Sequence, residues 1–165
     1  MDNRTLYALA FAIIGMGCRM IVFMLGWDFA WSTQLYFLFL LLAIFFGIRE
    51  YFKDNSESSF MQLFKYGAQI GAMFSLVVSI FTFVFYRFVD VLFFEDMKEE
   101  RLQAVRTTEV TPEQIENYQS NLDMVFNANT QAMVTLICFV LLGLTYSAIV
   151  SGILSKVPFF ARNFK

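Results

Sequence analysis

Hydrophobic residues along this chain gather into four long runs, separated by short polar segments and one long polar segment. A helix needs about 20 apolar residues to cross a hydrocarbon core about 30 Å thick, and the runs have about this length or more. The pattern therefore predicts four transmembrane helices, over residues 6–26, 31–48, 60–88 and 130–155. The expected fold class is all-α integral membrane, with residues 1–165 forming a single four-helix membrane domain.

The long polar segment, residues 89–129, is too charged to span a bilayer, since it holds nine carboxylates against three basic residues. Thr111, Pro112 and Gln114 are typical of a helix start, with Thr at the N-cap, Pro at N1 and Gln closing a capping box. We therefore predict that membrane helices 3 and 4 extend past the bilayer as an acidic antiparallel α-hairpin that turns near residues 107–111.

Apolar residues recur at helical spacing on both sides of the predicted turn. The downstream stripe contains Ile115, Tyr118, Leu122 and Val125 or Phe126, and the upstream stripe contains Val91, Leu92, Phe94, Met97, Leu102 and Val105. The two stripes are suited to face each other, and Ile115, Tyr118 and Leu122 are also candidates for docking a partner.

Two of the predicted membrane helices carry a small residue at every fourth position. These are Gly67, Gly71, Ser75 and Ser79 in the third helix, and Gly143, Ser147, Ser151 and Ser155 in the fourth. In lipid, helices associate through close backbone approach and interhelical hydrogen bonds, which such stripes permit. Because the two stripes lie at matching depths, we expect the third and fourth helices to pack directly against each other.

Composition narrows the chemistry available to the chain. Hydrophobic residues make up 58% of it and charged residues 16%, and there is no histidine. The commonest metal ligand and the commonest general base are therefore missing. Cys18 and Cys138 lie in apolar runs, where a thiol behaves as a small hydrophobe. We expect no catalytic residues, no metal site, no cofactor, no nucleic-acid partner and no enzyme activity.

Basic residues predict the orientation, because cytoplasmic loops are enriched in Lys and Arg. Seven of the twelve lie near the amino terminus, the second loop or the carboxyl tail, namely Arg4, Arg49, Lys53, Lys65, Lys156, Arg162 and Lys165. We expect a multi-pass protein of a bacterial inner membrane with both termini in the cytoplasm. Residues 89–129 are then periplasmic.

Arg19 is a charge deep inside a predicted span, where an unpaired guanidinium costs several kcal/mol. One interpretation is that it snorkels to the outer interface and meets Asp28 or Asp90. The other is that it contacts a lipid phosphate or a partner, because a guanidinium binds phosphate in a bidentate way.

Two further polar residues lie one helical turn apart on the inner part of the predicted third helix. Lys65 and Gln69, with Gln62 and Tyr66 nearby, are spaced to line an inner-leaflet pocket for an anionic headgroup. The alternative is that Lys65 only snorkels to the interface.

Three stretches resemble a bacterial family of small four-helix membrane proteins, the domain-of-unknown-function family 4199. They are Gly47-Ile48-Arg49-Glu50-Tyr51, Ser59 to Gly67 (Ser-Phe-Met-Gln-Leu-Phe-Lys-Tyr-Gly) and Phe85-Tyr86-Arg87-Phe88-Val89-Asp90. The resemblance implies an inner-membrane protein without an established activity. It also implies, as a partner to consider, a glycosyltransferase acting on a polyprenyl phosphate. The chain departs from the family pattern in having Arg87 after Phe85-Tyr86 and no proline after Asp90.

Three functions are compatible with these observations. The first is a non-catalytic accessory or scaffold subunit that docks a membrane protein partner through the acidic hairpin or its helix faces. The second is a protein that binds or handles a lipid phosphate through Arg19 and Lys65. The third is a small transporter or channel, which would have to be a homo-oligomer, because four helices with one buried charge leave little room for a polar pathway.

Overall fold

A computed structural model describes residues 3–27, 29–106 and 111–156, which are helical and contain no strand. Four of its helices are long and apolar enough to cross a membrane, as predicted: α1 (Asn3–Met24), α2 (Phe29–Asp54), α3 (Phe60–Val84) and α6 (Ala128–Lys156). Two shorter helices lie between α3 and α6, namely α4 (Phe93–Arg106) and α5 (Pro112–Val125). The chain is thus a multi-pass membrane protein with six α-helices in its described part.

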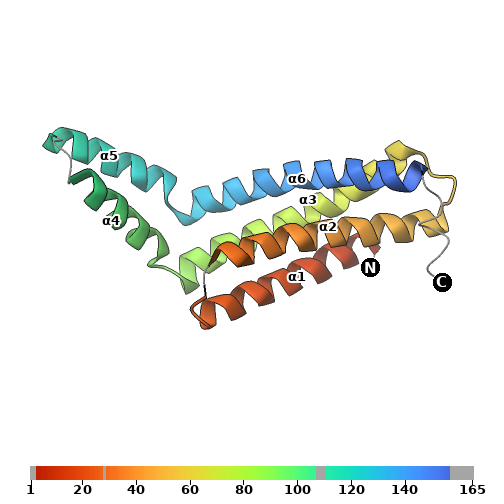
Figure 1. The fold of residues 1–165 in the computed structure, drawn as a ribbon, viewed down its shortest axis with the longest axis horizontal. Helices are drawn as coiled ribbons and strands as arrows, with labels where there is room; N and C mark the ends of the chain where they lie inside the picture. Colours follow the sequence, from red (N-terminus) through yellow and green to blue (C-terminus); the bar gives the residue numbers. More distant parts are fainter. Residues whose placement is uncertain (1–2, 28, 107–110, 157–165) are drawn as a thin grey trace. The chain divides into compact units, whose positions relative to one another are not determined.

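The chain forms two compact units, of which the first comprises residues 1–78 and 136–165. In its described part, α1, α2 and the adjoining parts of α3 and α6 lie side by side (Figure 1). Large apolar side chains fill the centre and are fully buried, including Leu40, Ile44, Ile48, Ile70 and Phe74. Other apolar side chains point outward, including Ile13, Ile21, Leu76 and Leu141, each more than half exposed. An apolar outer surface of this kind is suited to contact with lipid.

The helices α3 and α6 approach each other closely at two glycines. A Cβ atom built on Gly71 would lie 3.1 Å from the Cα atom of Gly143, so the two backbones are in contact. One turn away, a Cβ atom on Gly67 would lie 2.8 Å from the Oγ atom of Ser147. The structure therefore brings together four residues of the two small-residue stripes.

Serines of the same stripes have several different environments. Buried Ser75 and Ser147 donate to the carbonyl oxygens of Gly71 and Gly143, at 2.7 and 2.6 Å, so these hydroxyls are satisfied within their own helices. Ser151 is also fully buried. Ser155 is exposed and donates to the carbonyl of Gly152, so it lies off the packed face.

The second compact unit comprises residues 79–135. Here the Oγ atom of buried Ser79 donates to the carbonyl of Ala132 at 2.7 Å and links α3 directly to α6. A π-helical segment, Phe85–Val89, follows α3, and the Tyr86 ring packs against the rings of Phe93 and Phe94, with centroids 4.9 and 4.8 Å away. The exit from α3, which lacks the family's proline, is therefore a π-helical turn closed by aromatic packing.

The acidic segment contains the two predicted helices. The predicted capping box is confirmed: Thr111 Oγ1 accepts from the Gln114 amide nitrogen, and Gln114 Oε1 accepts from the Thr111 amide nitrogen at 3.0 Å. The helices α4 and α5 contact each other, and Lys98 of α4 forms an ion pair with Asp123 of α5 at 2.8 Å. Residues 107–110 of the predicted turn lie outside the described residues.

Both hairpin helices are separated from the spans by breaks, whereas the sequence suggested that α3 and α6 extend into the hairpin. The break before α6 has a local cause. Asn127 Oδ1 accepts from the Thr130 amide nitrogen at 2.9 Å, so Asn127 caps the start of α6. Hydropathy alone did not reveal this cap, because it lies beside the apolar run rather than in it.

Lys98 gives the hairpin a pH dependence. Its hydrogen bond to Asp123, aided by one to Glu95, raises the pKa of Lys98 above its ordinary value of 10.5. The ion pairs therefore stabilise the folded hairpin fully below pH 10.5 and are lost as the pH rises beyond it through the folded-state pKa.

We expect Lys98→Met to cost on the order of 1 kcal/mol at neutral pH, because partly exposed pairs are worth little. Thermal unfolding followed by circular dichroism measures this loss. The difference from the wild type should disappear at strongly alkaline pH, and a difference that persists there would contradict this account.

Candidate functional site

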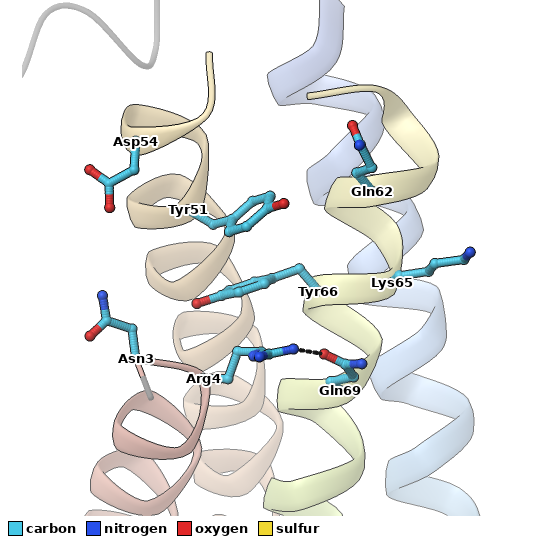
Figure 2. A pocket seen from close by; sticks show the side chains of 8 residues that line it. All are labelled: Asn3, Arg4, Tyr51, Asp54, Gln62, Lys65, Tyr66 and Gln69. Atoms are coloured by element: carbon cyan, nitrogen blue, oxygen red, sulfur yellow. Dashed lines mark hydrogen bonds between the residues drawn. The ribbon is translucent and has the colours of Figure 1, made fainter. Parts of the chain in front are cut away.

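A cleft of about 500 Å³ lies where α1 begins, α2 ends and α3 begins (Figure 2). Its lining residues are Asn3, Arg4, Tyr51, Asp54, Gln62, Lys65, Tyr66 and Gln69. They lie toward the ends of three apolar spans, and Gln69, the deepest of them on α3, is about 14 Å from the start of that helix at 1.5 Å per residue. A bilayer that covers the spans would therefore place this cleft near its headgroup layer.

Arg4 is held in this cleft by two residues on one face of α3. Its guanidinium donates a hydrogen bond to the Gln69 side-chain oxygen and lies 5.3 Å from the centroid of the Tyr66 ring. Tyr66 is 8% exposed and stacks on Tyr51 of α2, with ring centroids 4.3 Å apart. The two tyrosines thus link α2 to α3 and give the guanidinium a fixed aromatic surface.

The polar side chains that the sequence predicted to line one pocket have different contacts in the structure. Gln62 belongs to the start of α3, where its Oε1 atom accepts from the Ser59 backbone N–H at 2.8 Å and its own backbone N–H donates to Ser59 Oγ. Lys65 is exposed and extends away from the Arg4–Gln69 pair in Figure 2. Of the predicted residues, Gln69 and Tyr66 are therefore the ones in direct contact with a cation, and this cation is Arg4.

From the sequence, Arg4 indicated only the orientation of the chain in the membrane. It lies 65 residues from Gln69, so periodicity within a single helix does not relate them. The one indication that the sequence offered of this contact was the position of both residues within their spans. Arg4 lies at the start of the first span, and Gln69 lies in the early turns of the third. Because α1 is antiparallel to α2 and α2 is antiparallel to α3, the starts of α1 and α3 lie at the same end of these helices (Figure 1).

Arg19 lies apart from the cleft. It is 7% exposed and shares a buried face of α1 with Ala8, Ala12, Gly15 and Val22. Fifteen residues separate it from Arg4, or about 22 Å along the helix axis. Its suggested partner Asp28 lies outside the described residues, and Asp90 belongs to the second compact unit. The structure therefore does not bring Arg19 together with Lys65 and Gln69.

The proposed docking stripe on α5 is covered to different degrees. Leu122 is only 5% exposed, whereas Ile115 and Tyr118 are half-buried. On α4, Phe94 is buried and Met97, Leu102 and Val105 are half-buried, whereas Val91 and Leu92 precede the helix and are exposed, so the stripe that faces α5 is shorter than predicted. Leu122 thus serves the hairpin's own packing, and the carboxylates around it form the open surface.

Comparisons with known proteins address the family of the chain. Neither the curated proteins nor the solved structures contain a match to it. A family model, described as a protein of unknown function (DUF4199), matches residues 6–156. This match includes three candidate spans and the hairpin in full, the first span from residue 6 onward, and all of the cleft except Asn3 and Arg4. The chain therefore belongs to the DUF4199 family of proteins of unknown function.

Proposed function

We propose that this multi-pass membrane protein is a non-catalytic lipid-binding protein that holds the phosphate of a phospholipid headgroup in its cleft. One observation carries the proposal: Arg4 is fixed by Gln69 and Tyr66 in a cleft at the ends of three apolar spans. Headgroup phosphates lie at that level of a bilayer, and a guanidinium is the side chain best suited to bind them.

Two features of the cleft support the binding of a phosphate at Arg4. Because Gln69 and Tyr66 already orient Arg4, little side-chain entropy remains to be lost when a ligand binds. A volume of about 500 Å³ falls within the usual range for small-ligand sites.

A comparison of two lipids tests the proposal. The protein would be stripped of lipid in mild detergent and placed in nanodiscs containing a phospholipid and a diacylglycerol with the same acyl chains. Native mass spectrometry after release then reports which lipid is retained. We expect the phospholipid to be retained at least about tenfold better, since a charge-assisted hydrogen bond is worth about 1.5–3 kcal/mol. Equal retention of both lipids would contradict the proposal.

The accessory or scaffold role is a second candidate, and the surface of the hairpin supports it. Asp96, Glu99, Glu100, Glu113 and Glu116 are all exposed. Such a surface suits a partner with a basic face. Changing Glu99, Glu100, Glu113 and Glu116 to glutamine leaves Leu122 and Lys98 in place. If this role is correct, the variant should lose a protein that co-purifies with the wild type in stoichiometric amount. A wild-type protein that purifies alone would count against it.

A further inference from the structure

A second hollow adjoins the cleft around the connection between α2 and α3. It also measures about 500 Å³ and shares Tyr51, Asp54 and Gln62 with the cleft. Asn55, Ser56, Glu57 and Ser58 complete its lining, so its described lining residues include two carboxylates and no lysine or arginine. The two adjoining hollows therefore differ in charge: Arg4 and Lys65 line the first, Asp54 lines both, and Glu57 lines the second.

This charge distribution restricts what a bound headgroup can carry. With its phosphate at Arg4, a headgroup that extends toward the α2–α3 connection faces carboxylates, because Asp54 lines both hollows and Glu57 lines the second. A second anionic group there would be repelled, whereas an ammonium group would be attracted. Tyr51 lines both hollows and stacks on Tyr66, which lines the first, and aromatic faces also attract cations.

The position of Asp54 is not explained by helix stability. It is the last residue of α2 and is exposed, and a carboxylate at a helix C-terminus is unfavourable because of the helix dipole. Lys53, one residue earlier, already pairs with Glu50 at 3.2 Å. A ligand cation beside Asp54 would give this carboxylate a favourable partner.

We propose that the two hollows together bind a zwitterionic phospholipid headgroup, with its phosphate at Arg4 and its ammonium group at Asp54. This inference rests on the proposed function, which places the phosphate, and adds the chemical class of the headgroup. Asp54 then distinguishes an amine-bearing phospholipid from one that ends in hydroxyl groups.

Competition between two phospholipids tests the inference. Nanodiscs would contain phosphatidylethanolamine and phosphatidylglycerol in equal amounts, and native mass spectrometry would report the retained lipid. We expect the wild type to retain phosphatidylethanolamine about tenfold better, the worth of one charge-assisted hydrogen bond. Asp54→Asn should lose this preference and still retain phosphatidylglycerol. Glu50→Gln, a matched change one turn earlier on α2 and outside both hollows, should behave as the wild type.

The outcomes separate the inference from the proposed function. Equal retention of both phospholipids by the wild type would overturn the binding of an ammonium group and leave phosphate binding intact. A preference that survives Asp54→Asn would overturn the role of Asp54. Failure to retain either phospholipid better than diacylglycerol would overturn phosphate binding and this inference together. Asp54→Asn removes an unfavourable charge from a helix end, so the variant is expected to fold.

Discussion

Replacing Gly71 with leucine should lower the free energy of unfolding by about 3 kcal/mol, at the upper end of the usual cost of overpacking. The reason is that a Cβ atom on Gly71 meets the Cα atom of Gly143 at 3.1 Å. A backbone atom cannot rotate away as a side chain can, so a leucine fits only if α3 and α6 separate. Thermal unfolding in mild detergent, followed by circular dichroism, measures the loss.

Gly152→Leu provides the matched control, because a Cβ atom on Gly152 of α6 meets nothing within 4 Å. This variant should unfold close to the wild-type temperature or slightly above it, since leucine favours a helix more than glycine does. Gly71→Ala should fall between the two leucine variants. If Gly71→Leu is as stable as Gly152→Leu, the glycine contact does not hold the helix pair together.

Replacing Arg4 with glutamine should weaken phospholipid retention by about ten- to a hundredfold, which corresponds to about 1.5–3 kcal/mol for a hydrogen bond to a charged group. Glutamine can still hydrogen-bond to Gln69 but carries neither the charge nor the planar set of donors. The fold should therefore persist while phosphate binding is lost. Titration of the lipid-stripped protein with a phospholipid, read by native mass spectrometry, gives the two affinities.

Two further variants show whether position or mere charge is responsible. Lys53→Gln removes a cation from the end of α2 that does not line the cleft, and it should leave retention unchanged. Lys65→Gln should have a smaller effect than Arg4→Gln, because Lys65 extends away from the Arg4–Gln69 pair. Equal losses in all three variants would indicate attraction to surface charge in general and would contradict a specific site.

Much of the fold could be predicted because its signals are local. Long apolar runs specify four spans, and Thr111 with Gln114 specifies the start of α5. Helix ends were harder to predict, since hydropathy reports contact with lipid rather than the end of a helix. The helix α2 continues to Asp54, beyond the predicted end at residue 48, because the charged residues among 49–54 are compatible with a helix and Phe52 is buried in the core.

The candidate site was only partly predictable for a different reason. Gln69 and Tyr66 share one helix with Lys65, so their spacing alone suggested a common pocket. Arg4 and Tyr51 come from other helices, and their contact with Tyr66 depends on how α1, α2 and α3 pack. The direction of the Lys65 side chain depends on the same packing. Periodicity along one helix contains no information on any of these contacts.

The central claim is that a phospholipid headgroup occupies the cleft around Arg4, and photocrosslinking tests it most directly. A phospholipid with a photoreactive group in its headgroup would be incorporated into nanodiscs with the full-length protein, and the labelled residues would be identified by mass spectrometry. The account predicts labels on lining residues such as Tyr51, Tyr66 and Gln69 that are lost in Arg4→Gln. Labels spread over the helix ends without preference for the cleft, and unchanged in Arg4→Gln, would contradict it.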